Sequence, residues 1–258
     1  MDVIRNGDLD GKRFRYRIAV IVIGIIVLII FSLIESLSGK AQGVDENQGE
    51  DVTDMTDVSE DYDISGASDR NICYENRIAI TFDDGPKGKI TEELLDGLEE
   101  RGVKATFFLI GESAEKYPEV VKRMYDAGHL IGSHTYSHVK LCDMSTENAL
   151  EEIKKANSAI EGITGVRPKY IRPPYGMYSE QLLMSVNMTP VLWTVDPNDW
   201  NTTNAGTVVK KVVSKVKCGD IILLHDIYPS SVAAALEIID QLKAKGYIFV
   251  TVDQILLD

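Results

Sequence analysis

Short apolar runs alternate with amphipathic stretches from about Ile72 onward, and this alternation limits the fold more than any other feature of the sequence. The apolar runs have the length of strands, and the stretches between them have the length and periodicity of helices. Strands that are each followed by a helix lie parallel in one sheet, and the helices cover it. Seven or so such units predict an α/β domain, either an incomplete barrel or an open doubly wound sheet.

The boundaries of the expected elements follow from the same pattern. We expect strands at Arg77 to Phe82, Ala105 to Ile110, Leu130 to His134, Tyr170 to Arg172, Val191 to Val195, Ile221 to His225 and Ile248 to Val252. We expect helices at Ile90 to Arg101, Pro118 to Ala127 and Ser145 to about Ile163, and further helices that begin near Ser179, Asn204 and Ser230. Gly128 and Gly165 are predicted helix stops. In this class of fold the active face lies at the C-terminal ends of the strands.

The chain before residue 72 has a different composition. Residues 18–37 contain an almost uninterrupted run of Ile, Val, Leu and Phe, which is long enough to cross a membrane as a helix. Residues 1–17 carry a cluster of Lys and Arg, so the positive-inside rule predicts a cytoplasmic tail there. A cleaved signal peptide is the alternative, but the apolar run is long for one and no good cleavage site follows it. We therefore predict a single-pass membrane protein with residues 72–258 outside the cytoplasm.

Residues 38–71 form an acidic segment between the predicted anchor and the predicted domain. Within it, residues 41–69 contain ten acidic side chains and no basic one. Because this segment lacks apolar periodicity, burial cannot offset its ordering entropy, and we predict a disordered linker. An acidic binding tail is the alternative. The formal net charge of −13 argues against a nucleic-acid partner, and the sequence implies no protein partner.

The three cysteines, Cys73, Cys142 and Cys218, are odd in number and widely spaced. This spacing suggests neither a disulfide framework nor a thiolate zinc site, so we interpret the cysteines as mostly structural. His129, between a predicted helix stop and a strand, is also interpreted as structural.

Titratable side chains follow the ends of five predicted strands. These groups are Asp83-Asp84, His134 with His138, Arg172, Asp196 to Trp200, and His225-Asp226. Taken singly, an Asp-Asp-Gly-Pro sequence is usually only a turn, and a pair of histidines four residues apart is usually on the surface. Their joint placement at the active face predicts a site.

Asp84, His134 and His138 are the predicted metal ligands of this site. Two neutral imidazoles and one carboxylate suit Zn²⁺ and leave a coordination position for water, as in a catalytic zinc site. An Fe(II) oxygenase also uses two histidines and a carboxylate, but its scaffold is normally a β-sandwich rather than alternating strands and helices.

A catalytic site of this kind also needs a base and an acid. Asp83 is the predicted base, kept ionised and oriented by Arg172. His225 is the predicted acid, and Asp199 is its best orienting partner.

From Arg77 to Leu257 the sequence resembles the polysaccharide deacetylase family, the carbohydrate esterases of family 4 with the NodB homology domain. Five motifs carry the resemblance: Thr81-Phe82-Asp83-Asp84-Gly85-Pro86, His134-Thr135-Tyr136-Ser137-His138, Arg172-Pro173-Pro174-Tyr175-Gly176, Asp196 to Trp200, and Ile222-Leu223-Leu224-His225-Asp226. The resemblance implies a deformed (β/α) barrel and the same ligands, base and acid. It also implies that the Tyr175 backbone N–H stabilises the oxyanion, and that Trp200 and Leu223 line the pocket for the acetyl methyl group.

The resemblance implies metal-dependent removal of acetyl groups from an N-acetylated polysaccharide. Zn²⁺ is the expected cofactor, with Co²⁺ or another divalent ion as alternatives. Because the predicted topology places the domain beside the wall of a bacterial cell, we expect peptidoglycan as the substrate, at N-acetylglucosamine or N-acetylmuramic acid. Chitin oligosaccharides, an exopolysaccharide and acetylated xylan are alternative substrates. A non-catalytic glycan-binding module is the alternative from another functional class.

Overall fold

The computed structural model of the chain describes residues 76–256. The predicted cytoplasmic tail (1–17), membrane anchor (18–37) and linker (38–71) lie outside the described residues, as does Cys73. Among residues 76–256, the helices are all too short or too polar to cross a membrane.

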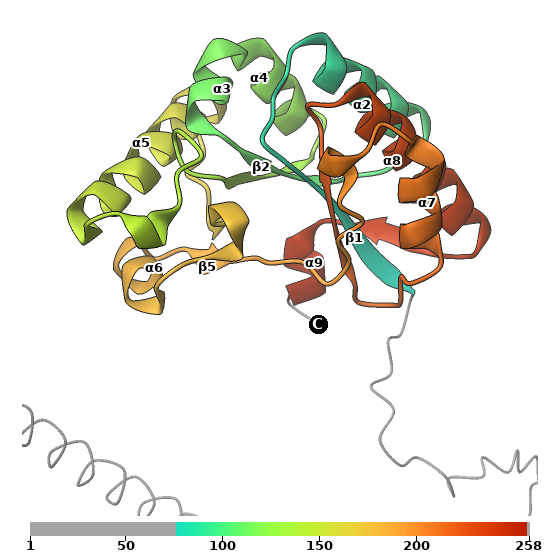
Figure 1. Ribbon diagram of the computed structural model, residues 1–258. Coiled ribbons are helices and arrows are strands. Elements are labelled where there is room, and N and C mark those ends of the chain that lie inside the picture. Colours follow the sequence, from blue (N-terminus) through green and yellow to red (C-terminus); the bar gives the residue numbers. More distant parts are fainter. Residues whose placement is uncertain (1–75, 257–258) are drawn as a thin grey trace, which may run out of the picture. The chain divides into compact units, whose positions relative to one another are not determined.

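The described residues form one parallel sheet with helices along its outer side (Figure 1). The strands are β1 (Arg77–Asp83), β2 (Thr106–Leu109), β3 (Leu130–Ser133), β4 (Tyr170–Ile171), β5 (Thr189–Pro190), β6 (Ile221–His225) and β7 (Ile248–Val250). The α-helices are α2 (Lys89–Glu100), α3 (Gly111–Lys116), α4 (Pro118–Asp126), α5 (Thr146–Thr164), α6 (Glu180–Val186), α7 (Ala205–Val213), α8 (Pro229–Ala244) and α9 (Val252–Leu256). Three short 3₁₀ helices are η1 (Leu141–Asp143), η2 (Pro174–Gly176) and η3 (Asp199–Asn201).

The strands follow the order β5-β4-β3-β2-β1-β6, and β7 pairs with the first residues of β1. All these pairings are parallel, as the alternation of strands and helices predicts. The result is a half-barrel, which agrees with the incomplete barrel expected from the sequence and not with an open doubly wound sheet. The strands' C-terminal ends therefore gather on one face.

Helix ends lie where the sequence places their caps. The Ser145 hydroxyl accepts a hydrogen bond from the Asn148 N–H, and α5 ends at Gly165, whose φ is 75°. Asn204 caps α7 in the same way. Helix α8 begins at Pro229, one residue before the predicted Ser230, because proline suits the first helical position, where its missing N–H costs nothing. The short helices α3 and α9 were not predicted.

The segment Val191 to Val195 was predicted as a strand and is not one. Its first N–H bonds to Ile171 of β4, and the N–H of Val195 bonds to Ile221 of β6, so the segment crosses from one sheet edge to the other. Arg172 donates to the carbonyls of Val191 and Leu192, which are then not used by a neighbouring strand. A buried guanidinium therefore replaces the strand ladder here.

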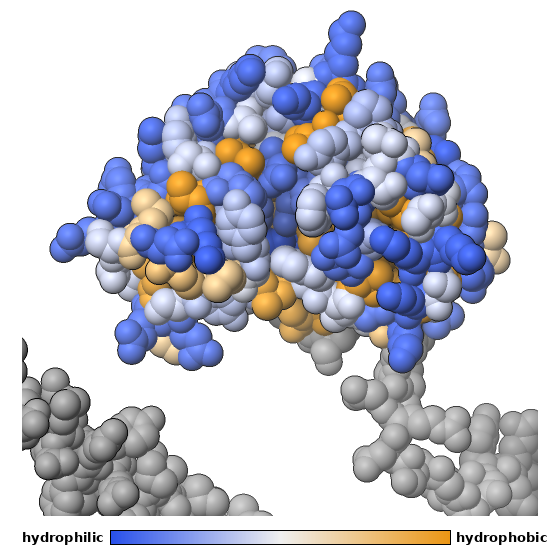
Figure 2. Space-filling view, in the orientation of Figure 1, coloured by the Kyte–Doolittle hydropathy of each residue, from blue (hydrophilic) through white to orange (hydrophobic). Residues whose placement is uncertain are grey.

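The main core cluster consists of apolar side chains from β1, β2 and β6 that pack against α2, α4, α7 and α8. Hydrophilic side chains cover most of the face shown in Figure 2 and line a hollow near its centre. Hydrophobic residues on this face form only small separate patches (Figure 2).

The structure tests the predicted structural roles of His129 and of the cysteines. The Nδ1 atom of His129 accepts a hydrogen bond from the Ala105 N–H at 3.1 Å, and burial lowers the pKa of His129 to about 4, so the ring is a neutral structural group. Cys218 takes part in a disulfide bond, whereas Cys142 is free and exposed. The cysteine spacing did not indicate this disulfide, because residues far apart in sequence leave no local signal of their pairing.

Candidate active site

The predicted site residues gather at the C-terminal face because the strands that carry them are in register. Asp83 of β1 and His225 of β6 are directly paired positions at the ends of their strands. His134 directly follows β3, and Arg172 directly follows β4, the neighbouring strand in the sheet. Parallel pairing therefore brings together side chains from four strands that are separated by up to 142 positions in the sequence.

Asp84, His134 and His138 form a compact group of potential ligands. The Oδ1 atom of Asp84 lies 3.4 Å from Nε2 of His134 and 3.3 Å from Nε2 of His138. One ligand atom from each residue lies within 4.8 Å of the other two. Within residues 76–256 this is the one group of three or more such side chains that meets the geometry of a metal site.

The chemistry of these three donors fits a divalent cation. The Oδ1 atom of Asp84 is buried and has no hydrogen-bond partner, although a buried polar atom normally has one. The Nδ1 atom of His134 lies 2.6 Å from the Arg172 carbonyl, which can only accept, so Nδ1 carries the proton and Nε2 keeps its lone pair. This arrangement prepares His134 as a ligand.

The charge states of the other two ligands are also suitable. Burial raises the pKa of Asp84, but its electrostatic interactions with the nearby histidines outweigh this effect, and the net pKa is below its ordinary value. Burial lowers the pKa of His138 further than the nearby carboxylates raise it. At neutral pH the site therefore offers the Asp84 carboxylate and a neutral His138 imidazole.

Asp83 is fixed by Arg172, as the sequence predicts. Oδ1 of Asp83 accepts a hydrogen bond from the Arg172 guanidinium at 2.7 Å, and Oδ2 lies 3.9 Å from Nε2 of His134. Arg172 also donates to the Thr81 hydroxyl, and its guanidinium stacks 4.2 Å above the Phe108 ring. Burial lowers the pKa of Arg172, while the charge of Asp83 opposes this change. One carboxylate oxygen of Asp83 is thus occupied, and the other faces the metal ligands.

His225 is held by Asp199 from two directions. Oδ2 of Asp199 accepts from the His225 backbone N–H at 2.9 Å, and Oδ1 accepts from the ring Nδ1 at 2.8 Å. Burial alone would lower the pKa of His225, but the bond to Asp199 and the charges of Asp83 and Asp84 raise it to about 9. The ring therefore carries a proton on Nε2 at neutral pH and can act as an acid.

Backbone strain is concentrated in the loops of this site. Of seven non-glycine residues with positive φ in the described part of the chain, five lie in the predicted motifs: Asp84, Thr135, His138, Tyr175 and Asn198. Such conformations persist where the surrounding structure holds them, and they cluster at functional sites.

The three predicted substrate-binding residues differ in their surroundings. The Tyr175 side chain is 65% exposed, and its ring meets the His138 ring edge-on at a centroid distance of 5.2 Å. Trp200 is 54% exposed beside Asp199, and Leu223 is buried in β6 two residues before His225. Tyr175 is thus in contact with the predicted ligand His138, while a shared pocket of Trp200 and Leu223 stays a prediction.

Asp226 has a structural role that sequence reasoning missed. It is fully buried, and its Oδ2 atom accepts a hydrogen bond from the Thr91 hydroxyl at 2.6 Å. Thr91 also accepts from the Lys87 N–H, so the contact joins the turn after Asp84 to the strand of His225. A Cβ atom at Gly85 would lie 2.2 Å from both carboxylate oxygens of Asp226. Both residues stand in the quoted motifs, but only the packing reveals their contact.

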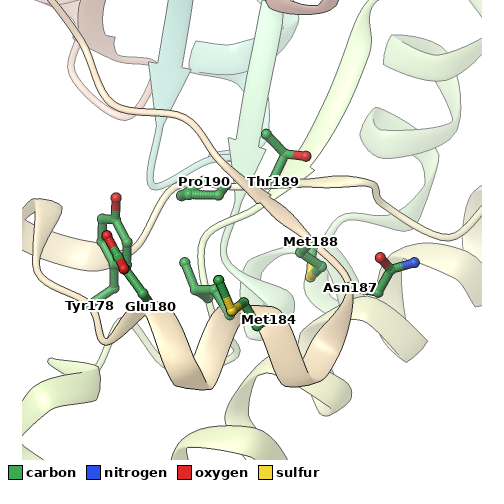
Figure 3. A pocket seen from close by; sticks show the side chains of 8 residues that line it. Tyr178, Glu180, Met184, Asn187, Met188, Thr189 and Pro190 are labelled. Atoms are coloured by element: carbon green, nitrogen blue, oxygen red, sulfur yellow. The ribbon is translucent and has the colours of Figure 1, made fainter. Parts of the chain in front are cut away.

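A cavity with a volume of about 450 Å³ lies between α6 and β5 (Figure 3). Met184 and Met188 lie on one side of it and Pro190 on the other (Figure 3). None of its lining residues is a predicted ligand, base or acid. The chemical groups described above therefore belong to a separate site.

The half-barrel and its strand-end site define the class of the protein. Residues 73–191 match the profile of the polysaccharide deacetylase family. The chain is 36% identical over 179 residues to a chitooligosaccharide deacetylase of Azorhizobium caulinodans, covering 68% of this chain and 85% of that protein. The chain belongs to the polysaccharide deacetylase family, as the motifs predict.

Two relatives that act on peptidoglycan are somewhat more similar. The chain is 41% identical over 179 residues to the peptidoglycan-N-acetylglucosamine deacetylase PgdA of Listeria monocytogenes. It is 43% identical over 178 residues to the peptidoglycan-N-acetylmuramic acid deacetylase PdaC of Bacillus subtilis. Each match covers 69% of this chain but only 38% of the relative.

Solved structures agree with this assignment. The structure of PdaC from Bacillus subtilis matches with a TM-score of 0.69 at 42% identity, over 71% of this chain and 91% of that chain. A family 4 acetyl xylan esterase from Clostridium thermocellum, in complex with a cobalt ion, matches with a TM-score of 0.66 at 35% identity, over 70% and 90% of the two chains. These relatives and structural neighbours are hydrolases that remove acetyl groups.

Proposed function

We propose that this chain is a metal-dependent deacetylase that hydrolyses the acetamide groups of a cell-wall polysaccharide. The observation that carries the proposal is the placement of a carboxylate and a protonated histidine beside one set of proposed metal ligands. Asp83 has a free carboxylate oxygen on the side of His134, and His225 is protonated because Asp199 and the site carboxylates raise its pKa. A base and an acid are both needed to hydrolyse an amide.

Asp84, His134 and His138 would hold the cation. When bound, a divalent cation supplies Lewis-acid polarisation of the acetyl carbonyl and lowers the pKa of water. Zn²⁺ is the first candidate, because two imidazoles and a carboxylate suit it, and Co²⁺ is the second.

The two halves of the reaction use Asp83 and His225 in turn. Asp83 takes a proton from the water as the water oxygen attacks the acetyl carbon. Arg172 keeps the Asp83 carboxylate in place. The Tyr175 N–H donates to the developing oxyanion. His225 then gives its Nε2 proton to the nitrogen as the carbon–nitrogen bond breaks, which leaves acetate and a free amine on the sugar. Proton exchange with solvent returns Asp83 and His225 to their starting states.

Release of acetate by wild-type protein and by an Asp83→Asn variant tests this proposal. The variant should bind the metal but lose turnover, because Asn cannot accept the proton. Wild-type activity in the purified variant would refute the base assignment. Binding of glycans by the wild type without any acetate release would instead favour the glycan-binding module.

We propose peptidoglycan as the substrate. Similarity to PgdA and PdaC supports this choice, and so does the predicted anchor at residues 18–37, which would keep residues 72–258 beside the wall. Because these two relatives act on different sugars, the proposal includes both N-acetylglucosamine and N-acetylmuramic acid.

Mass spectrometry of digested peptidoglycan, with and without enzyme, tests the substrate. Loss of one acetyl mass from either sugar would support the proposal and identify the position. Activity on chitin oligosaccharides, an exopolysaccharide or acetylated xylan, and none on peptidoglycan, would contradict it. Separation of cell membranes from the medium tests the anchor, since the proposed single-pass protein should remain with the membranes.

A further inference from the structure

The loop that carries the two proposed histidine ligands, residues 134–138, has a strained backbone. Thr135 has a φ of 66° and His138 a φ of 57°. A residue with a side chain keeps such a conformation only where contacts from the surrounding structure hold it. His134 adjoins β3 and bonds to the Arg172 carbonyl, but His138 lies four residues beyond it in the loop. The position of His138 therefore depends on what holds the loop.

The start of α3 supplies two of these contacts. The N–H groups of Gly111 and Glu112 donate to the carbonyls of Thr135 and Tyr136, each at 3.0 Å. These N–H groups belong to the first turn of a helix, where they have no partner within the helix itself. The contacts use carbonyl groups of the loop, so the N–H groups of the same loop need an acceptor elsewhere.

Glu152 of α5 is that acceptor. Its Oε2 atom accepts from the Tyr136 N–H at 3.2 Å and from the Ser137 N–H at 2.9 Å. Its Oε1 atom accepts from the Ser137 hydroxyl at 2.9 Å. One half-buried carboxylate thus receives three hydrogen bonds from Tyr136 and Ser137, the two residues between the strained positions Thr135 and His138. Hydrogen bonds to a charged acceptor are stronger than those between neutral groups.

We propose that Glu152 is a positioning residue that orders the loop so that Nε2 of His138 faces Asp84. This inference rests on the proposed function, because it assumes that Asp84, His134 and His138 bind a metal. Without the Glu152 carboxylate, the loop N–H groups would bond to water and the loop would sample other conformations. Binding of the metal would then have to order the loop, and that entropy cost would weaken the affinity.

Metal affinity of the full chain tests this inference more directly than activity does. We would titrate the metal-free protein with Co²⁺ and compare Glu152→Ala with Glu151→Ala. Glu151 is the exposed neighbour on the same helix, and both substitutions favour a helix equally. We expect Glu152→Ala to weaken Co²⁺ binding about tenfold, the lower end of the range seen when a residue that orients a metal ligand is removed. Glu151→Ala should bind as the wild type does.

Graded variants and a spectrum separate positioning from a general loss of folding. Glu152→Gln keeps one acceptor oxygen and should fall between wild type and Glu152→Ala, and Ser137→Ala should have a smaller effect than either. Saturating Co²⁺ should restore the wild-type visible absorption spectrum in Glu152→Ala, because the ligands are unchanged. If Glu152→Ala fails to fold, the Co²⁺ affinities of Glu152→Gln and Ser137→Ala test the inference. Weaker binding by Glu152→Gln than by Ser137→Ala would support it, and wild-type binding by both would overturn it.

Equal Co²⁺ affinities for Glu152→Ala and Glu151→Ala would overturn the inference and leave the proposed function intact. If wild-type protein bound Co²⁺ no better than an Asp84→Asn variant, the proposed metal site itself would be wrong. The two failures are therefore distinguishable.

Discussion

Asp199 accepts two hydrogen bonds from His225, one from its backbone N–H and one from its ring Nδ1. The backbone bond fixes where the residue lies, and the ring bond fixes which nitrogen faces the site. Because Asp199 is buried, its negative charge is poorly screened and stabilises the protonated ring. One side chain thus sets both the geometry and the charge of the proposed acid.

The pH dependence of activity should show the effect of Asp199 on the pKa of His225. Since His225 must be protonated to act as an acid, activity should fall as the pH rises through the pKa of His225, which is about 9 before the effect of a bound cation. An Asp199→Asn variant can still accept the backbone bond but lacks the charge. We expect the alkaline limb of its pH profile to move down by about one pH unit or more. An unchanged limb would show that another group provides the acid. Both profiles must be measured with the same metal, because a bound cation lowers the pKa of His225 in both proteins.

Removal of the proposed base should greatly reduce turnover and leave metal binding almost unchanged. We expect Asp83→Asn to lower kcat by about 10³-fold, within the range for general base catalysis. Its affinity for metal should change little, because Asp84 supplies the ligand. Asp96→Asn, which alters an exposed carboxylate of α2, should retain wild-type kcat. Kinetics and metal content measured on the same preparations check this prediction.

A bound metal should stabilise the folded domain. At a free metal concentration of 100 times Kd, binding adds about 2.7 kcal/mol. For a domain of this size each kcal/mol shifts Tm by about 2–4 °C. Addition of Zn²⁺ to chelator-treated protein should therefore raise Tm by about 5–10 °C. His138→Ala should abolish most of this rise, whereas His129→Gln should keep it because His129 is buried away from the site in contact with Ala105. An equal rise in all three proteins would point to a different metal site.

Gly85 should tolerate no side chain. Because a Cβ atom there would lie 2.2 Å from both oxygens of Asp226, Gly85→Ala must displace a buried carboxylate that bonds to Thr91. We expect a loss of about 2–4 kcal/mol in the free energy of unfolding, typical of overpacking together with a broken buried hydrogen bond. Gly162→Ala is the matched control, since the new methyl group meets nothing within 4 Å in α5. That variant should be about 1 kcal/mol more stable than wild type, as measured by chemical denaturation.

Much of the site could be predicted because its chemistry lies in local motifs. Asp83, Arg172 and His225 each follow an apolar run, so the fold class alone places them on one face. The pairings of Asp83 with Arg172 and of Asp199 with His225 were also predicted, and the structure contains both. The contacts of Glu152 with residues 134–138 and of Asp226 with Gly85 had no such signal in the sequence. Glu152 is one of several acidic residues on an amphipathic helix, and Asp226 looks like any polar residue after a strand.

By itself, the sequence determined the order of strands and helices, most of their ends, and the residue types available at the active face. These depend on periodicity and capping, which are properties of neighbouring residues. Only the tertiary structure decided that Val191 to Val195 crosses between sheet edges, that Glu152 holds the histidine loop and that Asp226 packs against Gly85. Such contacts depend on the shape and unused hydrogen-bonding groups of segments far apart in the chain, and neither leaves a periodic pattern in the sequence.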